Sequence, residues 1–336
     1  MLYDVTTIGD AMKDTFIFPD IEEMEKPVDE EKAGAKSGFD NYLVFGLGDK
    51  VTISDVDFSI GGTAANVATG LSRLGLKTNI VSSVGTDNNA NDILDRLKEY
   101  KVGIDSVKIH KNKNSSFSVI VSYKGERTIF VYHAFRPTDF TLPDDLKSEW
   151  VYLGPMAAGY ERIYNKVVNL VVKKNIKVAV NPGNIQIDRG LESFGGLKDL
   201  IEILFLNREE ALSLSALPGH PTVKEIARAI QTRGPKMVVI TDGNEGAYVY
   251  NGQDFLKVGP YPEKRLDSTG AGDAFASAFL ASYIYQNSLQ ESLKWGVTNS
   301  ASVITEIGAQ EGLLSRASVK RKVNEYRWPQ DSLRFS

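Results

Sequence analysis

The sequence of 336 residues contains no cysteine, which excludes disulfide bonds, a thiolate nucleophile and any cysteine-based metal site. Histidine is also scarce, since only His110, His133 and His220 occur. These three residues are scattered along the chain and do not have the spacing of a zinc site. Thiol chemistry and zinc centres are therefore not expected.

An excess of positive charge and long apolar segments are absent as well. The formal net charge of -4 argues against a nucleic-acid or anionic-membrane surface. No apolar run is long enough to span a bilayer, and the first residues lack the basic and then apolar pattern of a signal peptide. With 42% hydrophobic and 24% charged residues, the chain can bury a full core, so we expect a soluble cytoplasmic enzyme.

The chain does contain an alternation of strand-like and helix-like segments, which favours an α/β fold. Strands are expected at residues 2–8, 78–84, 150–153, 177–180, 203–206 and 236–241, and helices at 64–74, 89–100, 161–174, 208–215, 222–233 and 289–305. This order is typical of a mostly parallel sheet that helices cover on both faces.

Several segments depart from this alternation. Residues 117–132 and 247–258 read as hairpins, and residues 42–45 and 51–58 read as short strands that fit a small accessory sheet. Residues 20–36 are acidic and lack apolar periodicity, so we interpret them as a loop or a poorly ordered insertion.

The most informative stretch is residues 267–273, with the sequence DSTGAGD, which leads into a run of good helix formers. Glycines directly before a helix predict a tight turn into the helix N-terminus. The first turn of a helix leaves backbone N–H groups unpaired and carries partial positive charge, so it can bind an anion. Gly270 and Gly272 would let a phosphate approach the backbone. Asp273 would lie beside that phosphate or would only cap the helix.

This motif resembles the C-terminal signature of the ribokinase family of carbohydrate kinases, the PfkB family. The resemblance implies that Asp273 is the catalytic base. It also implies that Gly270, Ala271 and Gly272 form the anion hole for the transferred phosphate. ATP is then the phosphate donor.

The resemblance further implies a single ribokinase-like domain over residues 1–336. Its Rossmann-like central sheet would be mostly parallel and flanked by helices, with a small β-sheet lid formed by parts of residues 12–59 and 112–136. An insertion at residues 20–50 departs from the family pattern near the expected acceptor entrance. Lids of this family often mediate dimers, so a homodimer through the lid is also expected.

Five residues are candidates for binding the acceptor. Gly61 and Gly62 resemble the family's N-terminal di-glycine signature, which lies against the sugar, although such a pair is also a common turn. Asn66 can both donate and accept hydrogen bonds with hydroxyl groups. Carboxylates suit vicinal hydroxyls, and the resemblance assigns sugar binding to Asp14. Asp10 either does the same or caps a turn.

Two metal sites follow from the resemblance. Asn207 and Glu210 match the family's Asn-x-x-Glu motif and would orient Mg²⁺ and phosphates through water, or would only form a helix-capping box. Residues 307–310 resemble a late loop that, with a position like Asp267, binds a monovalent cation such as K⁺ in some members. Gly312 stands where those members often have a polar residue, so K⁺ stays an open alternative.

The nucleotide itself is expected at two further places. Thr241, Gly243 and Gly246 follow a predicted strand and resemble the family's nucleotide loop. Asn299, in the late predicted helix, matches a position near the adenine. Both assignments depend on their register with the stronger motifs.

These residues together predict ATP-dependent phosphorylation of a hydroxyl group. Two carboxylates in the acceptor site would repel a phosphorylated substrate, so a small neutral sugar, as in ribokinase or fructokinase, is the first expectation. A nucleoside is the alternative, because Phe16, Phe130, Tyr132 and Phe135 either stack on a base or pack within the protein. A non-catalytic sugar- or nucleotide-binding regulator is a further alternative, against which the intact Asp273 argues.

Overall fold

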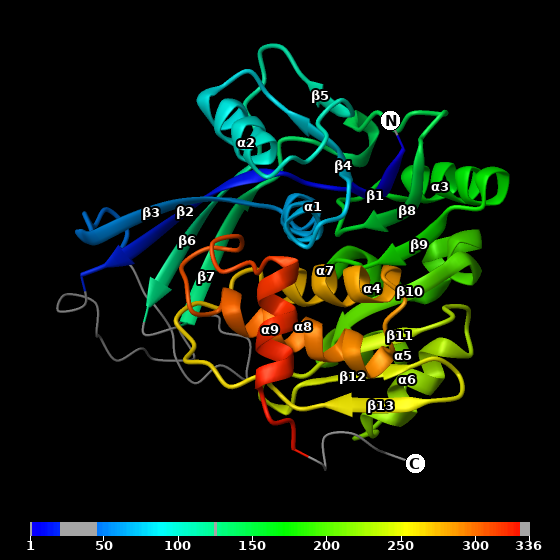
Figure 1. Cartoon of the computed structure of the whole chain (residues 1–336). Coiled ribbons are helices and arrows are strands. Elements are labelled where there is room, and N and C mark those ends of the chain that lie inside the picture. The colour runs from blue at the N-terminus through cyan, green and yellow to red at the C-terminus, as the bar shows by residue number, and fades with distance from the viewer. Residues whose placement is uncertain (1, 21–45, 124–125, 330–336) are drawn as a thin grey trace.

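The computed structural model of the protein describes residues 2–20, 46–123 and 126–329 (Figure 1). The strand expected at residues 42–45 and most of the insertion at residues 20–50 lie outside these ranges. Within the described ranges, no helix combines the length and the apolar character that crossing a bilayer requires.

A nine-stranded sheet forms the centre of the molecule. Its strands are β1 (Tyr3–Ile8), β4 (Thr78–Val84), β5 (Val107–Ile109), β8 (Ser148–Leu153), β9 (Lys177–Val180), β10 (Ile201–Asn207), β11 (Val238–Thr241), β12 (Ala247–Tyr250) and β13 (Phe255–Val258). They follow the spatial order β13-β12-β11-β10-β9-β8-β1-β4-β5. All neighbours pair in parallel except β12, which is antiparallel to β11 and β13. The mostly parallel sheet predicted from the sequence is therefore confirmed.

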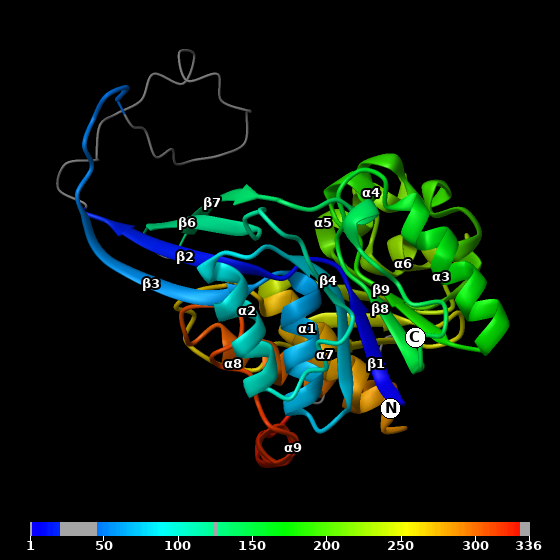
Figure 2. The ribbon, with the colours of Figure 1, turned by 90° about the horizontal axis from the view of Figure 1, so that it is seen from above.

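Helices cover both faces of this sheet (Figure 2). One face carries α1 (Thr63–Arg73), α7 (Ala271–Ile284), α8 (Leu289–Val303) and α9 (Arg316–Glu325), and the other carries α3 (Glu161–Lys174), α4 (Asn184–Arg189), α5 (Arg208–Ser215) and α6 (Val223–Gln231). Helix α2 (Asn88–Glu99) packs with α1 and β4. Two large apolar cores result, one around Phe279 and Trp295 and the other around Tyr160 and Phe194.

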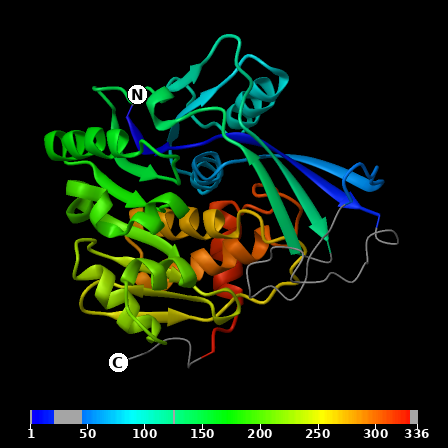
Figure 3. The same ribbon diagram turned by 180° about the vertical axis from the view of Figure 1, so that it is seen from behind.

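A separate four-stranded sheet, here called the lid sheet, extends away from the central sheet (Figure 1, Figure 3). Its strands, in the spatial order β3-β2-β6-β7, are β2 (Met12–Pro19), β3 (Ile53–Gly61), β6 (Phe117–Tyr123) and β7 (Glu126–Tyr132). Met12–Pro19 is not predicted as a strand, because charged residues interrupt its apolar positions. In the structure its residues alternate between buried and partly exposed, since one face of the lid sheet covers the protein.

Some short elements are also not predicted from the sequence. Helix α9 buries only Val319 and Val323, so its apolar periodicity covers a single turn. Strand β5 has three residues. Short 3₁₀ segments occur at Pro137–Asp139, Leu191–Leu200 and Gly243–Glu245. Patterns this short give too few positions for a period to be recognised.

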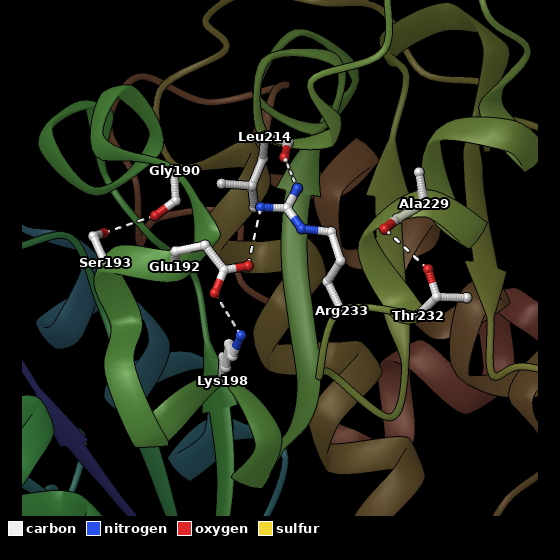
Figure 4. Close-up of polar contacts among 8 residues, drawn as sticks. All are labelled: Gly190, Glu192, Ser193, Lys198, Leu214, Ala229, Thr232 and Arg233. Carbon is white, nitrogen blue, oxygen red and sulfur yellow. Dashed lines mark hydrogen bonds and ion pairs between the residues drawn. The ribbon is translucent and has the colours of Figure 1, made fainter.

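Polar contacts join the 3₁₀ segment Leu191–Leu200 to α5 and to the turn after α6 (Figure 4). Glu192 pairs with Lys198 at 2.5 Å and with Arg233 at 3.4 Å, and Arg233 donates a hydrogen bond of 3.0 Å to the carbonyl of Leu214. Leu214 lies in the last turn of α5, so this bond satisfies a carbonyl that the helix leaves unpaired. The side chain of Glu192 is 65% exposed, so its ion pairs add little stability.

Candidate active site

Helices α1 and α7 approach each other closely at Gly70 and Ser277. A Cβ on Gly70 would come within 2.4 Å of the Ser277 hydroxyl, so only glycine allows this approach. Asn66 lies one turn before Gly70, and Asp273 lies one turn before Ser277, on the same helix faces. The crossing therefore brings the two helix starts together, and the Asn66 amide donates a hydrogen bond of 2.8 Å to the Asp273 carboxylate.

Both helices begin after a glycine, and no side chain caps either N-terminus. Gly62 precedes α1 with a φ of 89°, and Gly270 precedes α7 with a φ of 75°. These values lie in the region that favours glycine. The first turns of α1 and α7 therefore keep backbone N–H groups without side-chain acceptors, and each carries partial positive charge.

A cavity of about 260 Å³ opens at these two helix starts, between the lid sheet and the end of β1. Ligands of open α/β sheets bind at such carboxyl ends. Six residues predicted from the sequence line this cavity: Asp10, Asp14, Gly62, Asn66, Gly270 and Asp273. Ala271 and Gly272 continue the turn into α7.

Asp14 is a buried residue of β2 in the cavity wall. Its neighbour on β6, Ser118, donates a hydrogen bond of 2.6 Å to the carboxylate. Gly61 leaves room for the other carboxylate oxygen, since a Cβ there would lie 1.9 Å from it. Burial raises the pKa of Asp14 to about 6; the Ser118 hydrogen bond opposes this rise, and the charge of Asp273 adds to it.

Asp10 connects the central sheet to the lid sheet through His133, which directly follows β7. The Asp10 carboxylate and the Nδ1 atom of His133 are 2.8 Å apart. This hydrogen bond raises the pKa of His133, so the imidazolium is favoured beside the carboxylate. His133 is not predicted as a site residue. Its position directly after the predicted hairpin at residues 117–132 is the signal that could have indicated it.

Asp273 lies in the first turn of α7 and is partly buried. Burial raises its pKa to about 6, while hydrogen bonds from Asn66 and Thr63 act in the opposite direction. A carboxyl group whose pKa is close to neutral can take up a proton during a reaction and release it afterwards. The arrangement therefore suits general base catalysis at this cavity.

The expected magnesium residues lie at the end of β10. The Asn207 side chain accepts a hydrogen bond of 2.8 Å from the Glu210 N–H, and the Glu210 carboxylate accepts one of 2.9 Å from the Asn207 N–H. This is the capping box that the sequence leaves as the alternative. Burial raises the pKa of Glu210; the Asn207 N–H opposes this, and the charges of Glu209 and Asp273 add to it.

A divalent cation fits these surroundings only through water. Among the described residues, no three acidic or histidine side chains gather closely enough to hold a metal ion directly. Mg²⁺ is usually bound by one or two carboxylates together with waters and phosphates. Burial and the neighbouring acids disfavour the ionised form of Glu210, and a cation bound through water would offset this, so Glu210 can supply one such carboxylate.

The expected nucleotide loop lies beside this position. Thr241 pairs with Asn207 across β10 and β11, and the turn after β11 is closed by a hydrogen bond of 2.9 Å from the Asp242 N–H to the Gly246 carbonyl. The fold itself requires Gly246, because a Cβ there would lie 2.0 Å from a backbone carbonyl. A Cβ on Gly243 would meet no atom within 4 Å, so that position is open.

Known proteins resemble this chain in sequence and in fold. The sequence model of the pfkB family carbohydrate kinases matches residues 39–316. This chain belongs to that family. It is therefore a kinase, and the ribokinase-like fold expected from the sequence is confirmed by solved structures.

Relatives of this PfkB-family kinase differ in their named substrates. A cytidine kinase from Thermococcus kodakarensis is 28% identical over 313 residues, which cover 91% of this chain and 98% of that protein. A ribokinase from Arabidopsis thaliana, solved with ribose and ATP, gives a TM-score of 0.76 at 21% identity over 97% of this chain and 100% of that chain. A nucleoside kinase from Methanocaldococcus jannaschii gives a TM-score of 0.74 at 19% identity, over 97% of this chain and 99% of that chain.

In this PfkB-family kinase, Asn299, which the resemblance places near the adenine, lies in α8. The side chain is fully buried. Its Nδ2 donates a hydrogen bond of 2.8 Å to the carbonyl of Ala274, and its Oδ1 accepts one of 2.9 Å from the N–H of Leu314. The Asn299 amide therefore holds α7 against the segment before α9.

The surroundings of Asp267 do not fit the K⁺ ion that the sequence leaves open. Its carboxylate accepts hydrogen bonds from the N–H and hydroxyl of Thr269, at 3.0 and 2.9 Å, and from the N–H of Gly308 at 3.3 Å. It also pairs at 3.5 Å with Arg127 of β7, which contacts the Ser268 hydroxyl. The guanidinium already supplies positive charge at this carboxylate and would repel a cation.

The four aromatic residues considered for stacking on a base do not line the cavity. Phe16 and Phe135 are buried in the protein, while Phe130 and Tyr132 are exposed. Side chains alternate along β7, so Phe130 and Tyr132 point to the outer face of the lid sheet. The apolar wall of the cavity is instead aliphatic and consists of Met12, Ile120, Ile129 and Val131.

Proposed function

We propose that this protein transfers the γ-phosphate of ATP to a hydroxyl group of a small neutral sugar, with Asp273 as the general base. One observation carries the proposal. The carboxylate of Asp273 lines the same cavity as Asp14 and Asn66, which suit hydroxyl groups, at an uncapped helix start. A hydroxyl bound there would lie beside a proton acceptor and beside N–H groups that suit a phosphate.

The charges in the cavity support a neutral acceptor. Asp10, Asp14 and Asp273 all line it; His133 pairs with Asp10, and the carboxylates of Asp14 and Asp273 would repel a substrate that already carries a phosphate. Arg127 also lines the cavity, but its guanidinium is paired with Asp267, which offsets its attraction for an anion. A carboxylate can accept two hydrogen bonds at once, so Asp10 and Asp14 suit the neighbouring hydroxyls of a sugar ring.

In the proposed reaction, Asp273 removes the proton as the hydroxyl oxygen attacks the γ-phosphorus, and the bond from phosphorus to the leaving oxygen of ADP breaks. The backbone N–H groups of the turn from Gly270 through Ala271 and Gly272 stabilise the charge on the transferring group. Mg²⁺, held through water by Glu210 and Asn207, would neutralise charge on the phosphates.

For the nucleotide we propose the adjoining ends of β10 and β11. Asn207 and Thr241 are cross-strand neighbours there, and Gly243 follows them in an open turn. Gly246 shapes this turn. The phosphates would extend from it toward the start of α7, where the acceptor hydroxyl is proposed to lie.

A nucleoside is the second candidate acceptor, and the aliphatic wall of the cavity favours it. Ile129 and Val131 are 48% and 47% exposed although they line the cavity. A free pentose covers little apolar surface, whereas the flat face of a base would cover these two side chains. The cytidine kinase relative is consistent with this candidate.

ADP formation against a panel of acceptors tests the proposal. The panel contains ribose, fructose, cytidine, adenosine, guanosine and inosine, with fructose 6-phosphate as the phosphorylated control. Wild type should turn over one neutral acceptor in a Mg²⁺-dependent manner, and Asp273→Asn should not. Binding of an acceptor without ADP formation would identify a non-catalytic regulator instead, and turnover of only fructose 6-phosphate would refute the charge argument.

We also propose that two copies associate through the outer face of the lid sheet. By strand register, five of the exposed large apolar side chains of the lid sheet share this face: Val56, Phe58, Phe117, Phe130 and Tyr132. Exposed apolar patches of this kind are typical of protein–protein contacts. Light scattering after size exclusion should give a dimer for wild type and a monomer for Phe58→Asp/Phe130→Asp.

A further inference from the structure

Behind the cavity, a buried glutamine continues the contact between Asn66 and Asp273. Gln310 lies in the loop between α8 and α9, and its side chain is 0% exposed. Its Nε2 donates a hydrogen bond of 3.0 Å to Asn66 Oδ1, and Asn66 Nδ2 donates one of 2.8 Å to Asp273 Oδ2. The three side chains thus form a chain in which each N–H points toward Asp273.

The direction of this chain matters because the two ends of the Asn66 amide have nearly the same shape. With Nδ2 toward Asp273, the amide donates to the carboxylate; rotated by half a turn, its oxygen would face the carboxylate and repel it. Gln310 donates to the Asn66 oxygen and so favours the first orientation. A carboxylate that accepts a hydrogen bond ionises more readily, and the ionised form is the one that a base requires.

The turn before α7 holds Gln310 in place. A Cβ on Gly270 would lie 2.4 Å from the side chain of Ala309, so the loop packs directly on that turn. The N–H of Gly308 donates a hydrogen bond of 3.3 Å to Asp267. Gln310 itself is not among the described residues that line the cavity, so it acts from behind the site.

We propose that Gln310 is a positioning residue for phosphoryl transfer, which acts through Asn66 to keep an N–H directed at the Asp273 carboxylate. The inference rests on the proposed role of Asp273 as general base and extends it to a residue outside the cavity. Ionisable groups face Asp273 from the lid sheet, from β8, from the end of β1 and from α5: Asp10, Asp14, Arg127, His133, Tyr152 and Glu210. Asp267, in the loop before α7, acts on Asp14. All of them are kept in the variants below.

Gln310→Met tests the proposal, because methionine keeps much of the volume but has no N–H to donate. Without that donor the Asn66 amide can rotate. The acidic limb of the kcat profile should then move to higher pH by about one unit, with an about fivefold lower kcat near pH 6 and a loss that approaches about tenfold at lower pH. Gln186→Met is the matched control, because Gln186 is equally buried and bonds to Met156 and Gly183. It should lose thermal stability and keep the wild-type profile.

A double-mutant cycle separates this role from a general structural one. In an Asn66→Ala background there is no amide to orient, so adding Gln310→Met should change neither kcat nor the acidic limb. A further loss in that background, or an unmoved limb in Gln310→Met, would overturn the proposal.

A titration by NMR tests the same point without turnover. The carbon-13 shift of the Asp273 carboxyl group should report a higher pKa in Gln310→Met than in wild type, and equal values would refute the positioning role. If Gln310→Met does not fold, Gln310→Leu replaces it in this titration, because leucine also has no N–H to donate. If wild type phosphorylates no acceptor, the proposed function fails, whereas this titration still decides whether Gln310 acts on Asp273.

Discussion

The carboxylates of Asp14 and Asp273 line one cavity although they come from the lid sheet and from α7, and burial raises the pKa of each to about 6. The charge of Asp273 adds to the rise at Asp14. Burying these two acids in one cavity disfavours their ionised forms and so costs stability at neutral pH. A sugar that donates hydroxyl hydrogens to Asp14, with a proton acceptor beside it at Asp273, makes use of both.

The first prediction concerns Asp273 and the pH dependence of turnover. The base must be ionised, so kcat should fall as the pH decreases through about 6. Asp273→Asn should lower kcat by about two to four orders of magnitude, the usual contribution of a general base. A pH profile of kcat for both proteins checks this, with ATP binding measured by calorimetry to show that the nucleotide site is intact. Near-normal turnover by Asp273→Asn would exclude Asp273 as the base.

The second prediction is that Asp14→Asn stabilises the protein while it impairs acceptor binding. The pKa of Asp14 is raised in the folded state, so folding disfavours its ionised form, and stability is lost as the pH rises through about 6. The asparagine side chain does not ionise, so the Asp14→Asn variant does not lose this stability as the pH rises. The free energy of unfolding near pH 7.5 should increase by about 1–3 kcal/mol, and the difference should vanish toward pH 4. Denaturant unfolding at several pH values measures it.

Asp87→Asn is the control for the Asp14 substitution, because its expected change in the free energy of unfolding has the opposite sign. Burial raises the pKa of Asp87, but hydrogen bonds from Ser115 and from backbone N–H groups outweigh this and lower it. Its contribution is therefore present at neutral pH and is lost as the pH falls. Asp87→Asn should destabilise the protein near pH 7.5. Equal shifts for Asp14→Asn and Asp87→Asn would show that the charges do not determine either effect.

Sequence patterns sufficed for the features that one segment carries alone. The alternation of strands and helices predicts the mostly parallel sheet because each element shows its own period. Residues 267–273 predict the start of α7 for the same reason, since glycines followed by helix formers are visible within a single stretch. Family membership, which rests on such motifs, was likewise within reach of the sequence.

Contacts between segments that are distant in the chain could not be predicted from the sequence patterns. Ser118 meets Asp14 only because β2 and β6 pair in a register that places them opposite each other. Residues 129–132 of β7 are all apolar, so the pattern does not reveal which of them face the cavity, and a shift by one residue would exchange the two faces. This ambiguity left Phe130 and Tyr132 as candidates for stacking on a base, although they do not line the cavity in the structure.

The third prediction uses Gly272 to separate phosphate binding from folding. A Cβ on Gly272 would meet no atom within 4 Å, so the fold does not require glycine there. Alanine favours helices over glycine by about 0.5–1 kcal/mol, so Gly272→Ala should be at least as stable as wild type. Its kcat should nevertheless fall by about tenfold or more, because the methyl group would intrude on the phosphate at the turn.

Gly270→Ala provides the contrast for Gly272→Ala. The φ of Gly270 is 75°, and a Cβ would lie 2.4 Å from Ala309. This substitution should lower the thermal unfolding temperature, whereas Gly272→Ala should not. Wild-type turnover in a stable Gly272→Ala variant would contradict the anion hole proposed at this turn.

The last prediction concerns Arg127, which joins the lid sheet to the loop before α7. Its guanidinium pairs with Asp267 at 3.5 Å and contacts the Ser268 hydroxyl. Arg127→Met should lower kcat/KM for the acceptor by about tenfold, because the lid sheet would no longer be fixed over the turn that positions the phosphate. The ion pair is partly exposed, so the free energy of unfolding should change by only about 0–1 kcal/mol. Arg189→Met is the control, since Arg189 pairs with Glu161 outside the cavity. If both variants keep wild-type kcat/KM, the contact of Arg127 with the loop has no part in catalysis.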